Sequence, residues 1–162
     1  PRSTLFPYTT LFRSHDSTNN SDLQSDIADA LTATRTPKDA ETLLARLKDP
    51  KLVKPQDADR WLVYLLRNRY TRAIAWQWMV DNWAWLEETY KHDKSYDYLP
   101  RYAAGCVNTP EYAEKFHALF DDKVSQPLLK RNIELGSEEI ATRVAWLQRD
   151  LQGVQAFFKS VR

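Results

Sequence analysis

The sequence is poor in glycine and cysteine, and each shortage excludes a class of protein. Three glycines among 162 residues leave little material for tight hairpins or for glycine-rich phosphate-binding loops. Cys106 is the single cysteine, so neither an internal disulfide nor a multi-cysteine metal site can form. No apolar run approaches the roughly 20 residues that span a bilayer. We therefore expect a helical protein that does not enter a membrane, and we place it in the cytoplasm because one unpaired cysteine fits a reducing compartment.

Charge of one sign is also missing from the body of the chain. The formal net charge is +1, from 23 basic and 22 acidic residues. Arg2 and Arg13 stand in an N-terminal stretch, residues 1–14, that contains no acidic residue. Without these two arginines the basic count falls from 23 to 21, so the body carries no basic excess. We expect no nucleic-acid partner, because such binding requires a basic surface.

What the chain does contain is apolar residues at helical spacing. Starts with a proline at the first helical position occur at Thr36-Pro37, Lys54-Pro55 and Thr109-Pro110. We expect helices over about 22–34, 36–49, 54–68, 71–90, from 108 onward, and over 126–161 with a break at Gly136. Trp78 and Trp85 lie off the apolar stripe of the 71–90 helix, which predicts that this helix is covered on two sides.

About seven or eight helices in antiparallel pairs, with no convincing strand, predict an all-α fold. Paired helices of this length are typical of an α-solenoid of HEAT-like type.

Candidate chemical groups are few. Glu114, His117 and Asp121 share one helix face, with Asp122 beside them, and a helical Glu-x-x-His can form half of a dimetal site. There is no second copy of this motif, so we interpret the cluster as a solvated helix face. Cys106 could act as a nucleophile beside a histidine, but its small and apolar neighbours favour a buried structural thiol.

The order of several short motifs is more specific than any of them alone. They are Arg67-Asn68, Ala75-Trp76-Gln77, Asn82-Trp83, and, near the end, Ala145-Trp146-Leu147-Gln148-Arg149-Asp150. Together they resemble the C-terminal domain of aminopeptidase N-like zinc metallopeptidases, the family that includes the puromycin-sensitive and endoplasmic-reticulum aminopeptidases. The resemblance covers roughly residues 22–158.

The resemblance implies a HEAT-like α-solenoid that closes over a separate zinc-binding catalytic domain and shapes a chamber for peptides. It also implies a zinc site in the parent enzyme, held by an H-E-x-x-H motif, and a G-x-M-E-N loop that holds the substrate amine. Neither motif occurs in this sequence, so no catalytic, cofactor-binding or metal-binding residue carries over. The matching positions (Arg67, Asn68, Trp76, Asn82, Trp83, Trp146, Arg149 and Asp150) are expected to be architectural.

The first hypothesis is therefore a fragment of a peptidase that is inactive alone. Its partners would be the missing catalytic domain of the same chain and peptide substrates. Two other hypotheses remain open. One is a free-standing helical-repeat module that binds proteins on a concave surface. The other is a small all-α enzyme that uses Glu114, His117 or Cys106.

The N-terminus reads differently from the rest. Residues Thr4–Ser14, TLFPYTTLFRS, match one reading frame of a common sequencing-adaptor sequence. We therefore expect residues 1–14 to be an assembly artefact without ordered structure, 15–21 to be a linker, and 22–162 to be the helical domain. An artefact of this kind would also account for the missing start methionine and the missing catalytic domain.

Overall fold

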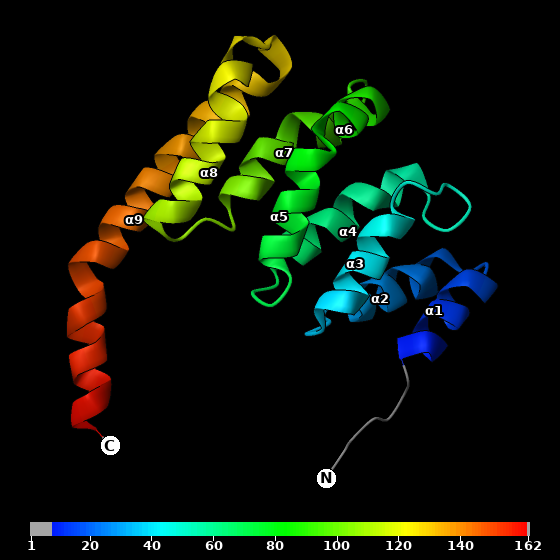
Figure 1. The fold of residues 1–162 in the computed structure, drawn as a ribbon, viewed down its shortest axis with the longest axis horizontal. Helices are drawn as coiled ribbons and strands as arrows, with labels where there is room; N and C mark the ends of the chain where they lie inside the picture. Colours follow the sequence, from blue (N-terminus) through cyan, green and yellow to red (C-terminus); the bar gives the residue numbers. More distant parts are fainter. Residues whose placement is uncertain (1–7, 162) are drawn as a thin grey trace. The chain divides into compact units, whose positions relative to one another are not determined.

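The computed structural model describes residues 8–161, and these residues contain α-helices, one short 3-10 helix and no strand (Figure 1). The all-α expectation is therefore confirmed. The chain divides into two compact units, residues 1–85 and 86–162. The helices of the first unit are α1 (Tyr8–Ser17), α2 (Ser21–Thr32), α3 (Pro37–Arg46), α4 (Pro55–Arg67) and α5 (Arg72–Asp81). Helix α6 (Trp83–Tyr90) spans the boundary, and α7 (Lys94–Ala104), α8 (Pro110–Phe120), the 3-10 helix η1 (Asp121–Ser125) and α9 (Pro127–Ser160) follow.

Local sequence sets most helix starts. A proline at the first helical position opens α3, α4, α8 and α9, as expected for the first three. The side chain of Asn20 accepts the backbone N–H groups of Asp22 and Leu23 at the start of α2. Thr109 accepts the N–H of Tyr112 in the same way at the start of α8. These caps satisfy donors that have no partner within the helix.

In the first unit, helices contact both the next helix and the next but one. Helix α2 packs against α3 and α4, and α3 packs against α4 and α5. This neighbour pattern is typical of stacked helix pairs in an α-solenoid. Its core is made of the leucines of α3 and α4 together with Trp61 and Met79, all at most 1% exposed.

In the second unit, α9 packs along α7 and also contacts α8 and η1. Gly136 does not break α9, contrary to the expectation from sequence, because the neighbouring helices need a residue without a side chain there. A Cβ at Gly136 would lie 2.9 Å from the Cβ of Ala104 and 3.1 Å from Cζ of Phe116. The glycine therefore permits close packing inside a continuous helix.

Two further boundaries differ from expectation. The helix expected over 71–90 divides at Asn82, whose side-chain amide donates to the Trp78 carbonyl at 2.7 Å and so ends α5. The segment 8–17, expected to be disordered and then linker, is helix α1, and residues 18–20 separate it from α2. Residues 1–7 lie outside the described residues, and the adaptor origin stays a prediction.

Helix α1 has an apolar stripe that the sequence analysis missed. Tyr8, Leu11, Phe12 and His15 stand at i, i+3, i+4 and i+7, which is the spacing of one helix face. His15 is the buried residue of α1, and its ring lies 5.2 Å from that of Trp61 on α4. The spacing explains why this stretch is helical, whatever its origin.

Candidate functional site

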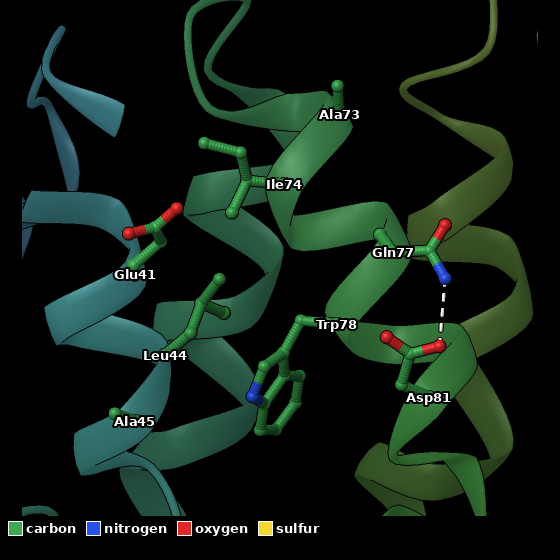
Figure 2. A pocket seen from close by; sticks show the side chains of 8 residues that line it. All are labelled: Glu41, Leu44, Ala45, Ala73, Ile74, Gln77, Trp78 and Asp81. Carbon is green, nitrogen blue, oxygen red and sulfur yellow. Dashed lines mark hydrogen bonds between the residues drawn. The ribbon is translucent and has the colours of Figure 1, made fainter. Parts of the chain in front are cut away.

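An open groove lies between α3 and α5 in the first unit. Its volume is about 500 Å³. Figure 2 shows Leu44 of α3 together with Ile74 and Trp78 of α5 directed into the space between the two helices. Glu41, Ala45, Ala73, Gln77 and Asp81 complete the lining. Helices α3 and α5 are separated in sequence by α4, but they lie side by side in the stack, and the groove runs between them.

The chemistry of the α3–α5 groove is that of a binding surface. Its floor is aliphatic and aromatic, and its two carboxylates, Glu41 and Asp81, stand at the edge. Gln77 donates from Nε2 to Oδ1 of Asp81 at 2.8 Å (Figure 2). No histidine, cysteine, serine or lysine lines the groove. The arrangement can therefore hold an apolar side chain beside two carboxylates.

The two tryptophans that lie off the main stripe meet beside this groove. Trp78 and Trp85 pack edge to face, with ring centroids 5.8 Å apart and planes at 75°. The ammonium of Lys48 lies 5.6 Å from the centre of the Trp85 ring. Both indoles are half-buried, so this second face of the 71–85 segment is partly covered. The sequence predicted this cover but not the groove next to it.

A second open pocket, of about 480 Å³, lies at the C-terminal ends of α2 and α4. Arg35, Tyr64, Arg67 and Tyr70 line it among others. The guanidinium carbons of Arg35 and Arg69 lie 5.2 and 4.7 Å from the centre of the Tyr70 ring. A hydrogen bond from Arg69 holds the pKa of exposed Tyr70 below its ordinary value. The exposed signature residue Arg67 thus belongs to a cationic, aromatic edge.

The signature residues of the first unit are placed in structural roles. Asn68 donates from Nδ2 to the carbonyls of Thr32 and Thr34, at 3.0 and 2.6 Å. Trp76 and Trp83 are 4% and 7% exposed. Asn82 ends α5 through the hydrogen bond from its side-chain amide to the Trp78 carbonyl, as described above. The structure thus brings these residues to helix ends and into the core, and not to a common site.

The signature residues near the C-terminus are placed differently. Trp146 is 54% exposed, so it does not occupy the core of the second unit, and its architectural role stays a prediction. Arg149 and Asp150 are paired with each other, with Nε 2.8 Å from Oδ1. This hydrogen bond from Arg149 holds the pKa of Asp150 below its ordinary value. The reason for the difference is that α9 leaves the body of the unit before it reaches Trp146.

The candidate metal cluster on α8 does not assemble. His117 and Asp121 are paired through Nδ1 and Oδ1 at 2.9 Å, and both are exposed. Glu114 and Asp122 are exposed as well, and Asp122 pairs with Lys123. Within residues 8–161, no group of three histidine, cysteine, aspartate or glutamate side chains could hold a metal ion. The cluster is a solvated helix face.

Cys106 and the other histidines form no catalytic set. Cys106 is 4% exposed, and its thiol donates to the Tyr102 carbonyl at 3.5 Å. His92 is exposed, and His15 is paired with Asp16 at the far end of the sequence. The thiol is therefore a core group, as the sequence predicted.

None of the helices over residues 8–161 combines the length and the apolar character needed to cross a bilayer.

Comparison with known proteins identifies the family. The family model described as the ERAP1-like C-terminal domain matches residues 8–142. The chain is 29% identical over 142 residues to aminopeptidase N of Lactococcus lactis subsp. lactis, which is 88% of this chain and 17% of that protein. It is 39% identical over 103 residues to aminopeptidase N of Lactococcus lactis subsp. cremoris strain MG1363, covering 64% of this chain and 12% of that protein.

A glutamyl aminopeptidase of Rattus norvegicus is 26% identical over 124 residues, which are 74% of this chain and 13% of that protein. The chain thus spans less than a fifth of the length of the curated relatives it matches. The family match begins at residue 8 and so includes the whole of α1. The chain belongs to the family of ERAP1-like C-terminal domains, the domain type that ends aminopeptidase N-like enzymes.

Proposed function

We propose that the chain is the C-terminal part of a zinc-dependent aminopeptidase that removes N-terminal residues from peptides. The observation that carries this proposal is the family match over residues 8–142, together with relatives that are named as aminopeptidases. The chain corresponds to at most 17% of their length, so the remaining length of a parent enzyme would hold the catalytic domain.

The described residues do not fit a zinc site. Among residues 8–161 no set of three suitable side chains comes together, and two of the three histidines are engaged with aspartates. Zinc in the parent enzyme would therefore be bound by the catalytic domain, and no chemical step is assigned to this chain.

The role that fits this chain is to cover the active site and to shape the chamber that holds the peptide. Stacked helix pairs would form one rigid side of the chamber, and the α3–α5 groove would give it an apolar surface. Closure of such a wall would confine the substrate and exclude water, which supports catalysis without supplying a reacting group. The partners would be the catalytic domain of the same polypeptide and peptide substrates.

We place the parent enzyme in the cytoplasm. The single cysteine is buried and a lone cysteine forms no internal disulfide, which suits a reducing compartment. Detection of the native protein in the soluble cytoplasmic fraction would support this placement, and its recovery from a secreted or periplasmic fraction would overturn it.

The genomic DNA upstream of the Asp22 codon tests the proposed function. We expect an in-frame H-E-x-x-H motif and a G-x-M-E-N motif in the same open reading frame. A native start codon close before Asp22, with no peptidase domain upstream, would show instead a free-standing binding module.

The purified chain tests the remaining possibility, a small all-α enzyme. We expect no turnover of aminoacyl fluorogenic substrates by the chain supplemented with zinc, because no group of three histidine, cysteine, aspartate or glutamate side chains in residues 8–161 could hold the metal. Turnover that disappears in an alanine variant of Glu114, His117 or Cys106 would contradict the proposal.

A further inference from the structure

The α3–α5 groove carries negative charge that the described part of the chain does not neutralise. Two of the residues that line it are charged, Glu41 on α3 and Asp81 on α5, and both are acidic and exposed. Among residues 8–161 neither carboxylate forms an ion pair with a lysine, arginine or histidine. Because they belong to different helices, the two carboxylates stand on opposite walls of the groove.

The position of Asp81 adds to this negative charge. Asp81 is the last residue of α5, where the helix macrodipole places partial negative charge. Gln77 donates from Nε2 to Oδ1 of Asp81 at 2.8 Å, which orients the carboxylate and leaves Oδ2 able to accept from a donor outside the chain (Figure 2). A cation is the partner that a carboxylate at this end of a helix favours.

The floor between the two carboxylates is apolar. Leu44 is 1% exposed, and Ile74 and Trp78 are half-buried. Figure 2 shows these three side chains directed into the space between the helices. The methyl side chains of Ala45 and Ala73 leave the groove open to solvent. An aliphatic side chain that enters from outside would therefore exchange water for apolar contacts.

The aromatic pair beside the groove already holds one cation. The Lys48 ammonium lies over the ring of Trp85, and Trp85 packs against Trp78. In the part of the chain that the structure describes, no lysine or arginine lies over the ring of Trp78 itself. Trp78 and Asp81 are three residues apart on α5, which makes them neighbours on the helix surface. A cation bound at Asp81 would therefore also lie near the Trp78 indole, where cation–π attraction favours it.

We propose that the α3–α5 groove binds a peptide segment in which apolar side chains stand beside lysine or arginine. An apolar side chain of the segment would cover the floor, while its cationic groups would reach Glu41 and Asp81. An acidic segment would be repelled by the two carboxylates, and a purely apolar segment would cover them without giving them a partner, which is costly. The inference rests on the groove alone and not on the proposed aminopeptidase function, because binding needs no hydrolysis.

A set of three capped peptides tests the chemistry of the occupant. The probe is lysine–leucine–leucine–lysine, acetylated and amidated. One comparison peptide has glutamate in place of lysine, and the other has serine in place of leucine. In an NMR titration of the full chain, we expect the probe to bind with a dissociation constant of about 0.1–1 mM and to shift the signals of α3 and α5. Each comparison peptide should bind at least about fivefold more weakly. Equal affinity for all three peptides, or tighter binding of the glutamate peptide, would overturn the proposal.

Removal of the two charges tests the site. Glu41→Gln combined with Asp81→Asn keeps the size of both side chains and should weaken binding of the probe at least about fivefold. Added salt should weaken binding to the wild-type chain and change little in the double variant. Asp26→Asn is the matched control and should keep wild-type affinity, because Asp26 is an exposed carboxylate of α2 outside the groove. Wild-type affinity in the double variant, with helicity unchanged by circular dichroism, would contradict the proposal.

Two other occupants of the groove are separated by further measurements. Sedimentation of the chain without peptide should show one chain at the concentration of the titration. A dimer that the double variant dissociates would assign the groove to a second copy and overturn the proposal. The full open reading frame, cloned from genomic DNA, should yield a protein that also binds the probe. Loss of binding in that protein would assign the groove to another part of the same polypeptide and would likewise overturn the proposal.

Discussion

The side-chain amide of Asn68 donates a hydrogen bond to the carbonyl oxygen of Thr34, 2.6 Å away and 34 positions earlier in the chain. A second bond reaches the Thr32 carbonyl at 3.0 Å, while Oδ1 of Asn68 accepts the N–H of Tyr70 at 3.0 Å. One side chain thus joins the end of α4 to the end of α2. These hydrogen bonds give a structural reason for the asparagine in the Arg67-Asn68 motif.

Replacing Asn68 tests this connection. Asn68→Asp keeps the shape but turns the two donated bonds into contacts between oxygens, so it should lower the free energy of unfolding by about 1–3 kcal/mol or more. Urea denaturation measures the change. Asn108→Ala, at an exposed position, is the control and should be nearly silent. A silent Asn68→Asp would show that the bonds to the α2 end contribute nothing.

The glycines of α9 give a matched pair of variants. Gly136→Ala must displace Ala104 or Phe116, so it should destabilise the protein by about 1–3 kcal/mol despite the better helix propensity of alanine. At Gly153 a Cβ would meet nothing within 4 Å, so Gly153→Ala should stabilise by about 0.5–1 kcal/mol. Thermal unfolding of both variants checks the opposite signs. Equal shifts in one direction would refute the close packing at Gly136.

The signature tryptophans should differ sharply from one another. Trp76→Ala and Trp83→Ala should each cost about 3–5 kcal/mol of stability, because both indoles are buried. Trp146→Ala should change the stability of the monomer by less than about 0.5 kcal/mol, because its side chain is largely exposed. Chemical denaturation of the three variants compares the losses. A large loss of stability in Trp146→Ala would contradict the exposed position of this indole.

Alkaline pH should weaken the second unit through Tyr96. Burial, followed by the hydrogen bond that its hydroxyl donates to Glu87 at 2.9 Å, raises the pKa of Tyr96 well above its ordinary value. Because the folded pKa exceeds the unfolded one, the stabilisation is complete below about pH 10 and is lost as the pH rises further. Tyr96→Phe should remove this part of the pH dependence, at a loss of about 1 kcal/mol near pH 7.

Unfolding free energies from pH 7 to 11 measure the effect of Tyr96. Tyr98→Phe, at a tyrosine that is 44% exposed, is the control and should keep the wild-type slope. Identical slopes for wild type and Tyr96→Phe would contradict the argument.

Predictions from the sequence were correct for features that depend on residues adjacent in the chain. They were wrong where contacts between residues distant in the chain determine the structure. Proline at the first helical position and side-chain caps are local, and the helix starts at Pro37, Pro55 and Pro110 were correct. Gly136 was judged by its helix propensity alone, although its packing against α7 and α8 decides the outcome.

The candidate site shows the same limit. The α3–α5 groove brings together residues about 30 positions apart. The local sequence around Leu44 or Trp78 contains no pattern that predicts a groove. Trp146 was judged by its place in a motif, but its burial depends on where α9 leaves the body of its unit. Helix α1 was within reach, because Tyr8, Leu11, Phe12 and His15 have helical spacing.

The activity of a chimera tests the aminopeptidase assignment most directly. Residues 15–162 would replace the matching region of aminopeptidase N from Lactococcus lactis subsp. lactis, and kcat/KM would be compared with the intact relative and with a version that lacks the region. We predict a chimera within about tenfold of the intact relative and a truncated enzyme at least about a hundredfold below it. A folded, soluble chimera that is no more active than the truncated enzyme would contradict the assignment.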